Sequence, residues 1–201
     1  MRRIGLYGGS FDPVHDAHLA LARTALEHLQ LDELRWIPVG DAWHKERRLS
    51  PAEDRAAMVS LAIADEPRFV LERCELERQG PSYTIDTVRQ LKAAQQAHAA
   101  EWFLVMGQDQ YGKLHTWHDW RALLPEVAFA VASRDGAPPV ASAELAALPH
   151  RAVVLPLPRI DVSSTDIRRR VAAGQGISSM VPPAVASYID RHHLYRGTPG
   201  S

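Results

Sequence analysis

The feature that most constrains the fold is a turn near the start of the chain, residues 8–18, which read GGSFDPVHDAH. Residues 3–7 before it are apolar enough for a buried strand. After it, Leu19, Ala22, Leu26 and Leu29 recur at helical spacing. A strand, a turn and a helix in this order predict the start of an α/β unit, whose ligands bind at the carboxyl end of the strand.

The residues of this turn are suited to holding a phosphate. Gly8 and Gly9 let the backbone approach a ligand closely, and the following helix start offers unpaired N–H groups. His15 and His18 are three residues apart, so their rings lie on one side of the helix start. The segment lacks the glycine spacing of dinucleotide-binding and Walker A loops, so it must bind phosphate in a different way.

Two other interpretations of the histidines stay open from the residues alone. His15 and His18 can simply cap and pack the helix start. Together with Asp12 or Asp16 they can also hold zinc, although no third ligand stands at a recognisable spacing.

The rest of the chain alternates between strand and helix patterns. The expected strands after the first are 34–38, 69–71 with 74–76 as its continuation, 102–106, 127–131 and 152–155. Helices are expected at about 50–64, 83–97 and 142–148, then up to Gly174, and from Pro182 to about His192. This order predicts an α/β fold with a doubly wound, mostly parallel sheet. We expect one domain, 1–196, and a flexible tail, 197–201.

Composition excludes several classes of protein. The 201 residues contain 23 Lys and Arg against 24 Asp and Glu, which gives no basic excess for binding nucleic acid. No apolar run approaches the length of a membrane span. Cys74 is the one cysteine and cannot form an intrachain disulfide. We therefore expect a cytoplasmic protein without nucleic-acid or membrane partners.

A second candidate phosphate site lies at residues 163–168, which read SSTDIR. Hydroxyl groups, free backbone N–H groups at a helix start and the Arg168 guanidinium suit the terminal phosphates of a nucleotide. The alternative is an ordinary helix cap with solvated arginines.

Together, the two segments resemble the nucleotidyltransferases with the H-x-G-H signature. Residues 81–84 (PSYT), 107–109 (GQD) and 114–117 (LHTW) narrow the resemblance to the bacterial nicotinate-nucleotide adenylyltransferase family, over about residues 4–196. This resemblance implies a Rossmann-like nucleotidyltransferase fold. Two departures stand out: Ala17 replaces the signature glycine, and residues 41–43 (DAW) replace prolines that are frequent in the family.

The resemblance also implies the roles of individual residues. His15 and His18 are the catalytic pair, in contact with the ATP phosphates around the α-phosphorus. The residues expected to bind ATP are Gly8, Gly9, Ser10, Phe11, Gly107, Asp109, Ser164, Thr165, Ile167 and Arg168. Those expected to bind the second substrate are His44, Lys45, Thr84, Trp117, His118 and Arg134.

The implied reaction transfers the adenylyl group of ATP to nicotinate mononucleotide and releases pyrophosphate. The expected cofactor is Mg²⁺ that arrives with ATP, without a dedicated metal site, and a homo-oligomer is left open. Three alternatives remain: an adenylyltransferase for nicotinamide mononucleotide or phosphopantetheine, a non-catalytic nucleotide-binding regulator, and a zinc hydrolase.

Overall fold

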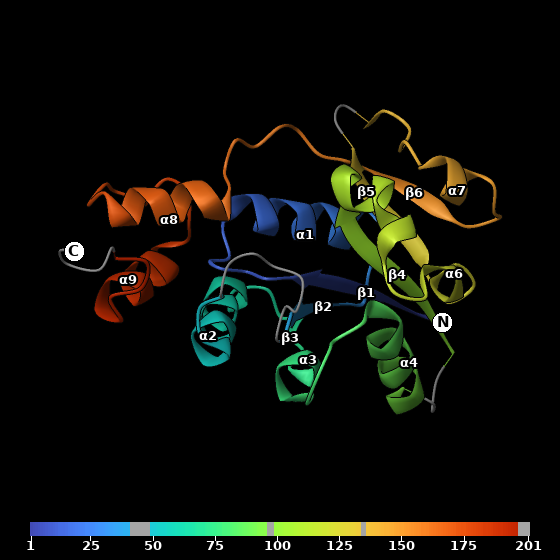
Figure 1. The fold of residues 1–201 in the computed structure, drawn as a ribbon, viewed down its shortest axis with the longest axis horizontal. Helices are drawn as coiled ribbons and strands as arrows, with labels where there is room; N and C mark the ends of the chain where they lie inside the picture. Colours follow the sequence, from blue (N-terminus) through green and yellow to red (C-terminus); the bar gives the residue numbers. More distant parts are fainter. Residues whose placement is uncertain (41–48, 96–98, 134–135, 197–201) are drawn as a thin grey trace.

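The computed structural model contains a six-stranded sheet in the order β3-β2-β1-β4-β5-β6, and it describes residues 1–40, 49–95, 99–133 and 136–196 (Figure 1). The strands are β1 Arg2–Gly9, β2 Glu33–Pro38, β3 Phe69–Leu71, β4 Ala100–Gly107, β5 Ala128–Ser133 and β6 Ala152–Pro156. Every neighbouring pair is parallel. The predicted doubly wound parallel sheet is confirmed.

Helices cover both faces of the sheet, so the molecule has three layers. One face carries α1 Asp16–His28, α2 Ala52–Ile63, α8 Ser164–Ala172 and α9 Pro183–Arg191. The other carries α3 Cys74–Glu77, α4 Thr84–Ala94, α5 Gln108–Gly112, the 3₁₀ helix η1 Leu114–Thr116, α6 Trp120–Leu123 and α7 Ala143–Ala146. No helix in the described residues is long and apolar enough to cross a membrane.

The central strand β4 shows why the chain builds two cores. Trp102, Leu104 and Met106 pack into the core on the α4 face. Phe103 and Val105, between them, pack into the core on the α1 face. Successive strand residues point to opposite faces, so a continuous apolar run fits a strand that is covered on both sides.

The expected continuation of the third strand through residues 74–76 is wrong. β3 ends at Leu71, and Cys74 begins the short helix α3. The Glu72 carboxylate accepts a hydrogen bond from the Cys74 N–H at 3.1 Å, and the N–H groups of Leu76 and Glu77 donate to the carbonyl of Arg73. These local bonds close a helical turn instead of a strand ladder.

Residues 108–123 contain three short helical segments that periodicity did not predict, namely α5, η1 and α6. Each spans three to five residues, too short to show a 3.6-residue repeat. Asp119 before α6 has a left-handed backbone with φ of 46°, which turns the chain sharply. Tertiary packing therefore decides the path here.

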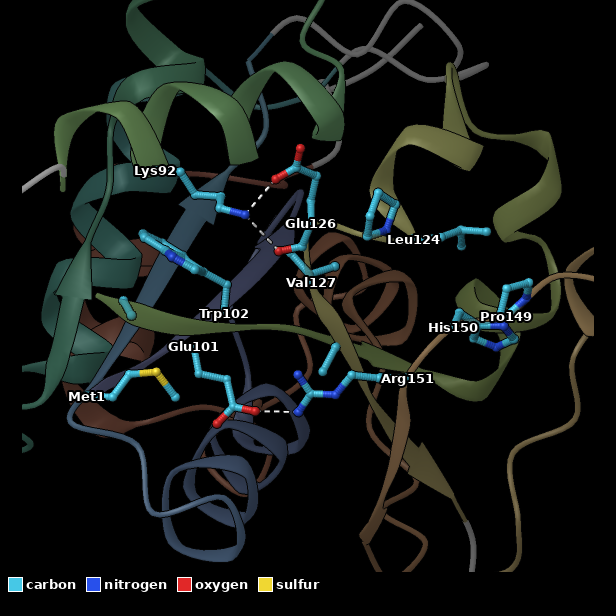
Figure 2. Close-up of a pocket in the computed structure, with 13 residues that line it drawn as sticks. Met1, Lys92, Glu101, Trp102, Leu124, Glu126, Val127, Pro149, His150 and Arg151 are labelled. Carbon is cyan, nitrogen blue, oxygen red and sulfur yellow. Dashed lines mark hydrogen bonds and ion pairs between the residues drawn. The ribbon is translucent and has the colours of Figure 1, made fainter. Parts of the chain in front are cut away.

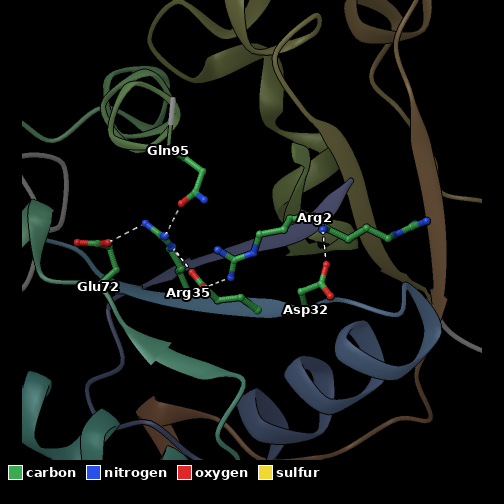
Figure 3. Close-up of polar contacts among 7 residues, drawn as sticks. Arg2, Asp32, Arg35, Glu72 and Gln95 are labelled. Carbon is green, nitrogen blue, oxygen red and sulfur yellow. Dashed lines mark hydrogen bonds and ion pairs between the residues drawn. The ribbon is translucent and has the colours of Figure 1, made fainter. Parts of the chain in front are cut away.

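A polar network ties together elements near one edge of the sheet (Figure 3). Arg35 on β2 donates to Glu33 on the same strand, to Glu72 after β3 and to Gln95 after α4. The Asp32 carboxylate accepts from the Arg3 N–H at 2.7 Å. These contacts link the β2 region to β1, to the residue that follows β3 and to the end of α4.

Candidate active site

A cavity of about 440 Å³ opens at the carboxyl ends of β1 and β4, where the strand order reverses. In open α/β sheets this position is the usual ligand site. The residues that line it are Leu6, Tyr7, Gly8, Gly9, Ser10, His18, Leu21, Ile37, Val39, Glu75, Ser82, Thr84, Thr87, Val88, Leu104, Val105, Met106, Gly107, Gln110 and Trp117. Seven predicted site residues are among them: Gly8, Gly9, Ser10, His18, Thr84, Gly107 and Trp117.

His15 and His18 form a stacked pair at the start of α1. Their ring centroids are 3.6 Å apart, with an angle of 24° between the ring planes. The His15 N–H donates to Nδ1 of His18 at 3.1 Å. Because Nδ1 accepts this bond, the proton of a neutral His18 ring is assigned to Nε2. The fold thus gives the cavity a ring with its N–H donor on a fixed nitrogen.

Burial keeps both histidines neutral near pH 7. Desolvation lowers the pKa of His15 to about 4. Desolvation, and then the proximity of His15, hold the pKa of His18 well below its usual range. A ligand phosphate placed beside the rings would supply negative charge and raise both pKa values.

The turn before α1 uses its glycines in two different ways. A Cβ on Gly9 would meet the Phe11 ring at 2.9 Å, whereas a Cβ on Gly8 would meet nothing within 4 Å. The Phe11 side chain is buried among Tyr7, Trp36 and His18, on a backbone with φ of 45°. The Phe11 ring therefore belongs to the core, and Phe11 is not among the residues that line the cavity.

The two predicted phosphate segments lie side by side, as the close approach of the starts of α1 and α8 in Figure 1 shows. Ser164 Oγ donates to the carbonyl of Pro13 at 2.9 Å. Arg168 donates to the carbonyl of Asp12 at 2.7 Å and to Thr165 Oγ1 at 3.1 Å. These contacts join α8 to the turn across more than 150 residues of sequence.

Ile167 is the member of the second segment that faces inward. Its side chain is fully buried in the core under α1, and its N–H donates to the carbonyl of Ser163. Ser163 caps the helix by accepting from the Asp166 N–H at 3.1 Å. Ile167 therefore anchors α8, whereas Thr165 beside it is exposed and Arg168 is half-buried.

The structure adds Arg55, which the sequence analysis missed. Its buried guanidinium donates to the carbonyls of Ser10, Val39 and Ser50 at 3.1, 2.7 and 3.0 Å. One side chain thus holds the turn after β1, the end of β2 and the start of the segment before α2. The available signal was its spacing of four residues from Val59, which places both on the buried face of α2.

The end of the cavity near the start of α4 contains residues that the sequence analysis assigned to the second substrate. Thr84 begins α4, whose first N–H groups have no acceptor within the helix. Trp117 lines the cavity nearby, and the exposed His118 ring stacks on Tyr83 at 3.9 Å. This end therefore offers flat aromatic surface and helix N–H donors.

Glu75 also lines the cavity, a residue that the sequence analysis placed in a strand. Its Oε1 accepts from Thr87 Oγ1 at 2.7 Å, and Thr87 accepts in turn from Arg78 at 3.0 Å. Burial raises the pKa of the Glu75 carboxyl, which the bond from Thr87 partly opposes. Raising the pKa reduces the tendency of this group to carry charge inside the cavity.

Asp109 is exposed on α5, outside the set of residues that line the cavity. His44, Lys45 and Arg134 lie outside the described residues. Among the described residues, no group of three or more His, Cys, Asp or Glu side chains is placed to hold a metal ion.

A second hollow, of about 630 Å³, lies at the opposite ends of the strands (Figure 2). Its charged groups pair with one another: Lys92 Nζ contacts Glu126 at 2.5 Å, and Arg151 contacts Glu101. It contains none of the predicted site residues. The cavity at the carboxyl ends is therefore the candidate active site.

Comparison with known proteins shows the family of this chain. The family model described as cytidylyltransferase-like matches residues 6–170, which include the turn after β1 and the start of α8. The chain belongs to the cytidylyltransferase-like family. The predicted nucleotidyltransferase resemblance is thereby confirmed at the level of the family.

Similar proteins of known name point to one group of nucleotidyltransferases. A protein from Methylibium petroleiphilum, named probable nicotinate-nucleotide adenylyltransferase, is 58% identical over 96% of this chain and 92% of its own length. One from Bordetella petrii with the same name is 46% identical over 98% and 100%. They confirm the expected resemblance to bacterial nicotinate-nucleotide adenylyltransferases.

Solved structures share the fold. Nicotinic acid mononucleotide adenylyltransferase from Plasmodium falciparum, complexed with NaAD, matches with a TM-score of 0.76 at 20% identity, covering 97% of this chain and 98% of the other. The same enzyme complexed with APC matches equally well at 19% identity. At this identity the likeness shows the fold alone.

Proposed function

We propose that this cytidylyltransferase-like protein transfers the adenylyl group of ATP to nicotinate mononucleotide, giving nicotinate adenine dinucleotide and pyrophosphate. The observation that carries the proposal is the stacked pair of His15 and His18, in which His18 lines the cavity, beside the bond between the first turn of α8 and Pro13. The names of the relatives at up to 58% identity support the choice of reaction.

The reaction needs no protein nucleophile. A 5′-phosphate oxygen of the mononucleotide attacks the α-phosphorus of ATP in line, and the bond from that phosphorus to the bridging oxygen of the β-phosphate breaks. Pyrophosphate leaves with that oxygen and its electron pair. Catalysis of this kind depends mainly on positioning and on stabilising the charge of the transition state.

In this proposal His18 donates its Nε2–H to an oxygen on the α-phosphorus. The backbone bond to Nδ1 fixes both the tautomer and the ring orientation, so the donor is in place before the substrate arrives. Stacked at 3.6 Å, the two rings repel each other when both are protonated. A bound polyphosphate would favour protonation of the pair.

The first turn of α8 takes the β- and γ-phosphates. Thr165 is exposed there, and Arg168 is partly exposed, so both can meet a polyphosphate. The bonds from Arg168 to Asp12 and from Ser164 to Pro13 keep this turn in register with the histidines. The placement of the phosphate-binding turn of α8 relative to the histidines is thus set by contacts between the two segments.

The acidic ring of the acceptor occupies the end of the cavity near Trp117 and Thr84. Free N–H groups at the start of α4 favour a negatively charged group there. Trp117 offers an aromatic face for the flat ring. Gly107, the last residue of β4, and Asp109 on α5 are assigned to ATP, while His44, Lys45 and Arg134 keep their expected role on the acceptor.

The nucleotide substrate is MgATP, whose metal is carried by the phosphates and water. We place the enzyme in the cytoplasm, acting on small molecules. A homo-oligomer is compatible with this function.

Pyrophosphate release with MgATP tests the reaction. We expect release with nicotinate mononucleotide and much less with nicotinamide mononucleotide or phosphopantetheine. Preference for either of the latter would change the assigned acceptor. A protein that binds ATP but releases pyrophosphate with none of the three would be a regulator, and stoichiometric zinc in the purified protein would favour a hydrolase.

The role of His18 is tested by the variant His18→Ala. Loss of one donor to the transition state should lower kcat by roughly 10²- to 10³-fold. His28→Ala is the matched control, because His28 is exposed at the other end of the same helix. Near-normal turnover of His18→Ala would remove His18 from the mechanism.

A further inference from the structure

The last part of the described chain reaches back to the turn that follows β1. The Tyr195 hydroxyl donates to Oδ1 of Asp12 at 2.6 Å, across 183 residues of sequence. The backbone at Tyr195 is left-handed, with φ of 61°. A bulky residue keeps this conformation only where its surroundings enforce it. The contact with Asp12 is therefore a specific feature of the fold.

Asp12 is a junction between the parts of the candidate site. Its side chain is fully buried, and Oδ2 accepts from the Ser50 N–H at 3.2 Å. Its backbone carbonyl accepts from Arg168 at 2.7 Å. One residue thus contacts the start of the segment before α2, the phosphate-binding turn of α8 and the end of the chain. A movement of Asp12 would displace Arg168.

The last helix, α9, makes a second tyrosine–aspartate hydrogen bond, which lies away from the turn after β1. Tyr188 on α9 donates to Asp54 on α2 at 2.8 Å. These two helices pack against each other, as Figure 1 shows. Tyr188 and Tyr195 therefore both give a phenol hydroxyl to an aspartate, but only Tyr195 reaches the turn.

We propose that Tyr195 is a positioning residue for the reaction: its hydrogen bond to Asp12 holds the turn after β1 and the Arg168 guanidinium in the arrangement that binds the ATP phosphates. This inference rests on the proposed function, because it assumes that Arg168 meets those phosphates. Tyr195 itself is not among the residues that line the cavity. Its effect passes through Asp12.

The variant Tyr195→Phe removes only the hydroxyl and leaves a buried carboxylate oxygen without that donor. We expect kcat/KM for MgATP to fall about tenfold, the size expected from losing one hydrogen bond to a charged group. Calorimetry should show a similar weakening for a non-hydrolysable ATP analogue. The KM for the mononucleotide should stay within about twofold, because its ring is assigned to Thr84 and Trp117, which belong to other elements of the fold.

Tyr188→Phe is the control, and its kcat/KM for MgATP should match that of the wild type. The second measurement compares the double variant Asp12→Asn with Tyr195→Phe against the two single variants. If Tyr195 acts through Asp12, the loss of kcat/KM for MgATP in the double variant, expressed as a free energy, is smaller than the sum of the losses in the single variants.

Each outcome decides whether the hydrogen bond from Tyr195 to Asp12 positions the ATP-binding groups or only stabilises the fold. The inference fails if Tyr195→Phe keeps wild-type kcat/KM, if Tyr188→Phe loses as much, or if the losses in the double variant simply add. It also fails if Tyr195→Phe does not fold while Tyr188→Phe does, because the contact would then serve stability alone. An inactive wild type would instead refute the proposed function.

Discussion

At the candidate site, adjacent residues can serve different purposes: one allows the core to pack, and the other leaves room for a ligand. Gly8 and Gly9 are adjacent in sequence, yet only Gly9 is constrained by a neighbour, the Phe11 ring. Gly8 is exposed and faces the cavity. The sequence analysis gave both glycines the same role, close approach of a ligand. The structure gives Gly9 a packing role as well.

Substituting Gly8 and Gly9 separately by alanine should distinguish the packing role from the ligand-access role. Gly9→Ala forces a methyl group against a buried ring and should lower the free energy of unfolding by about 1–3 kcal/mol. Gly8→Ala meets open space, so stability should change by less than about 0.5 kcal/mol while kcat/KM for MgATP falls. Urea denaturation and steady-state rates check both. Equal destabilisation by the two variants would contradict this distinction.

The histidine pair should also make stability depend on pH. The folded state holds His15 with a pKa of about 4, against about 6.5 in the unfolded chain, so the unfolded state binds more protons between these values. The free energy of unfolding should therefore fall as the pH drops from 6.5 to 4, by about 3 kcal/mol from His15 alone. The lowered pKa of His18 adds to this in the same direction.

Urea denaturation at pH 7 and pH 4.5 measures this loss. The variant His15→Asn should lose less stability than the wild type over the same range, since it has no imidazole to protonate. Identical pH profiles for the two proteins would show that His15 is not responsible.

At the scale of elements, the first turn of α1 contains Ala17, the residue that replaces the glycine of the family signature. Ala17 is the second residue of α1 and has helical backbone geometry, so its methyl group causes no backbone strain. The signature glycine is therefore not needed for the conformation of the chain at this position. A glycine here would serve only closer approach of a ligand.

Restoring the signature with Ala17→Gly tests which of these matters. The variant should lose up to about 1 kcal/mol of stability, because glycine is a poorer helix former than alanine. The KM for MgATP should be unchanged or lower. Thermal unfolding and steady-state kinetics measure the two effects, and a gain in stability would argue that the helix start is strained by Ala17.

At the scale of the molecule, the end of the chain closes the structure onto its beginning. α9 packs on α2, and Tyr188 and Tyr195 bond to Asp54 and Asp12. We therefore predict that residues 1–196 unfold as one unit. Far- and near-ultraviolet circular dichroism should give coincident urea transitions, and MgATP should shift both equally. A separate early transition that involves the last two helices would contradict a single domain.

The sequence alone determined the order of the six strands and of the longer helices between them, and it indicated two candidate phosphate-binding segments. Apolar runs such as 102–106 need cover on both faces, and alternation with helices leaves a parallel sheet as the consistent solution. Glycines, histidines and hydroxyls at helix starts carry their chemistry locally, so their pattern is readable without a structure. The family resemblance added the roles of particular residues.

Only the tertiary structure decided which side chains line the cavity and which hold the surrounding segments together. Ile167 and the Phe11 ring belong to the core, whereas Arg55 and Tyr195 hold the turn through hydrogen bonds to distant segments. Such contacts join residues separated by 45 to 183 positions, so no local periodicity records them. They arise because buried carbonyls and carboxylates must find donors wherever the fold brings one within reach.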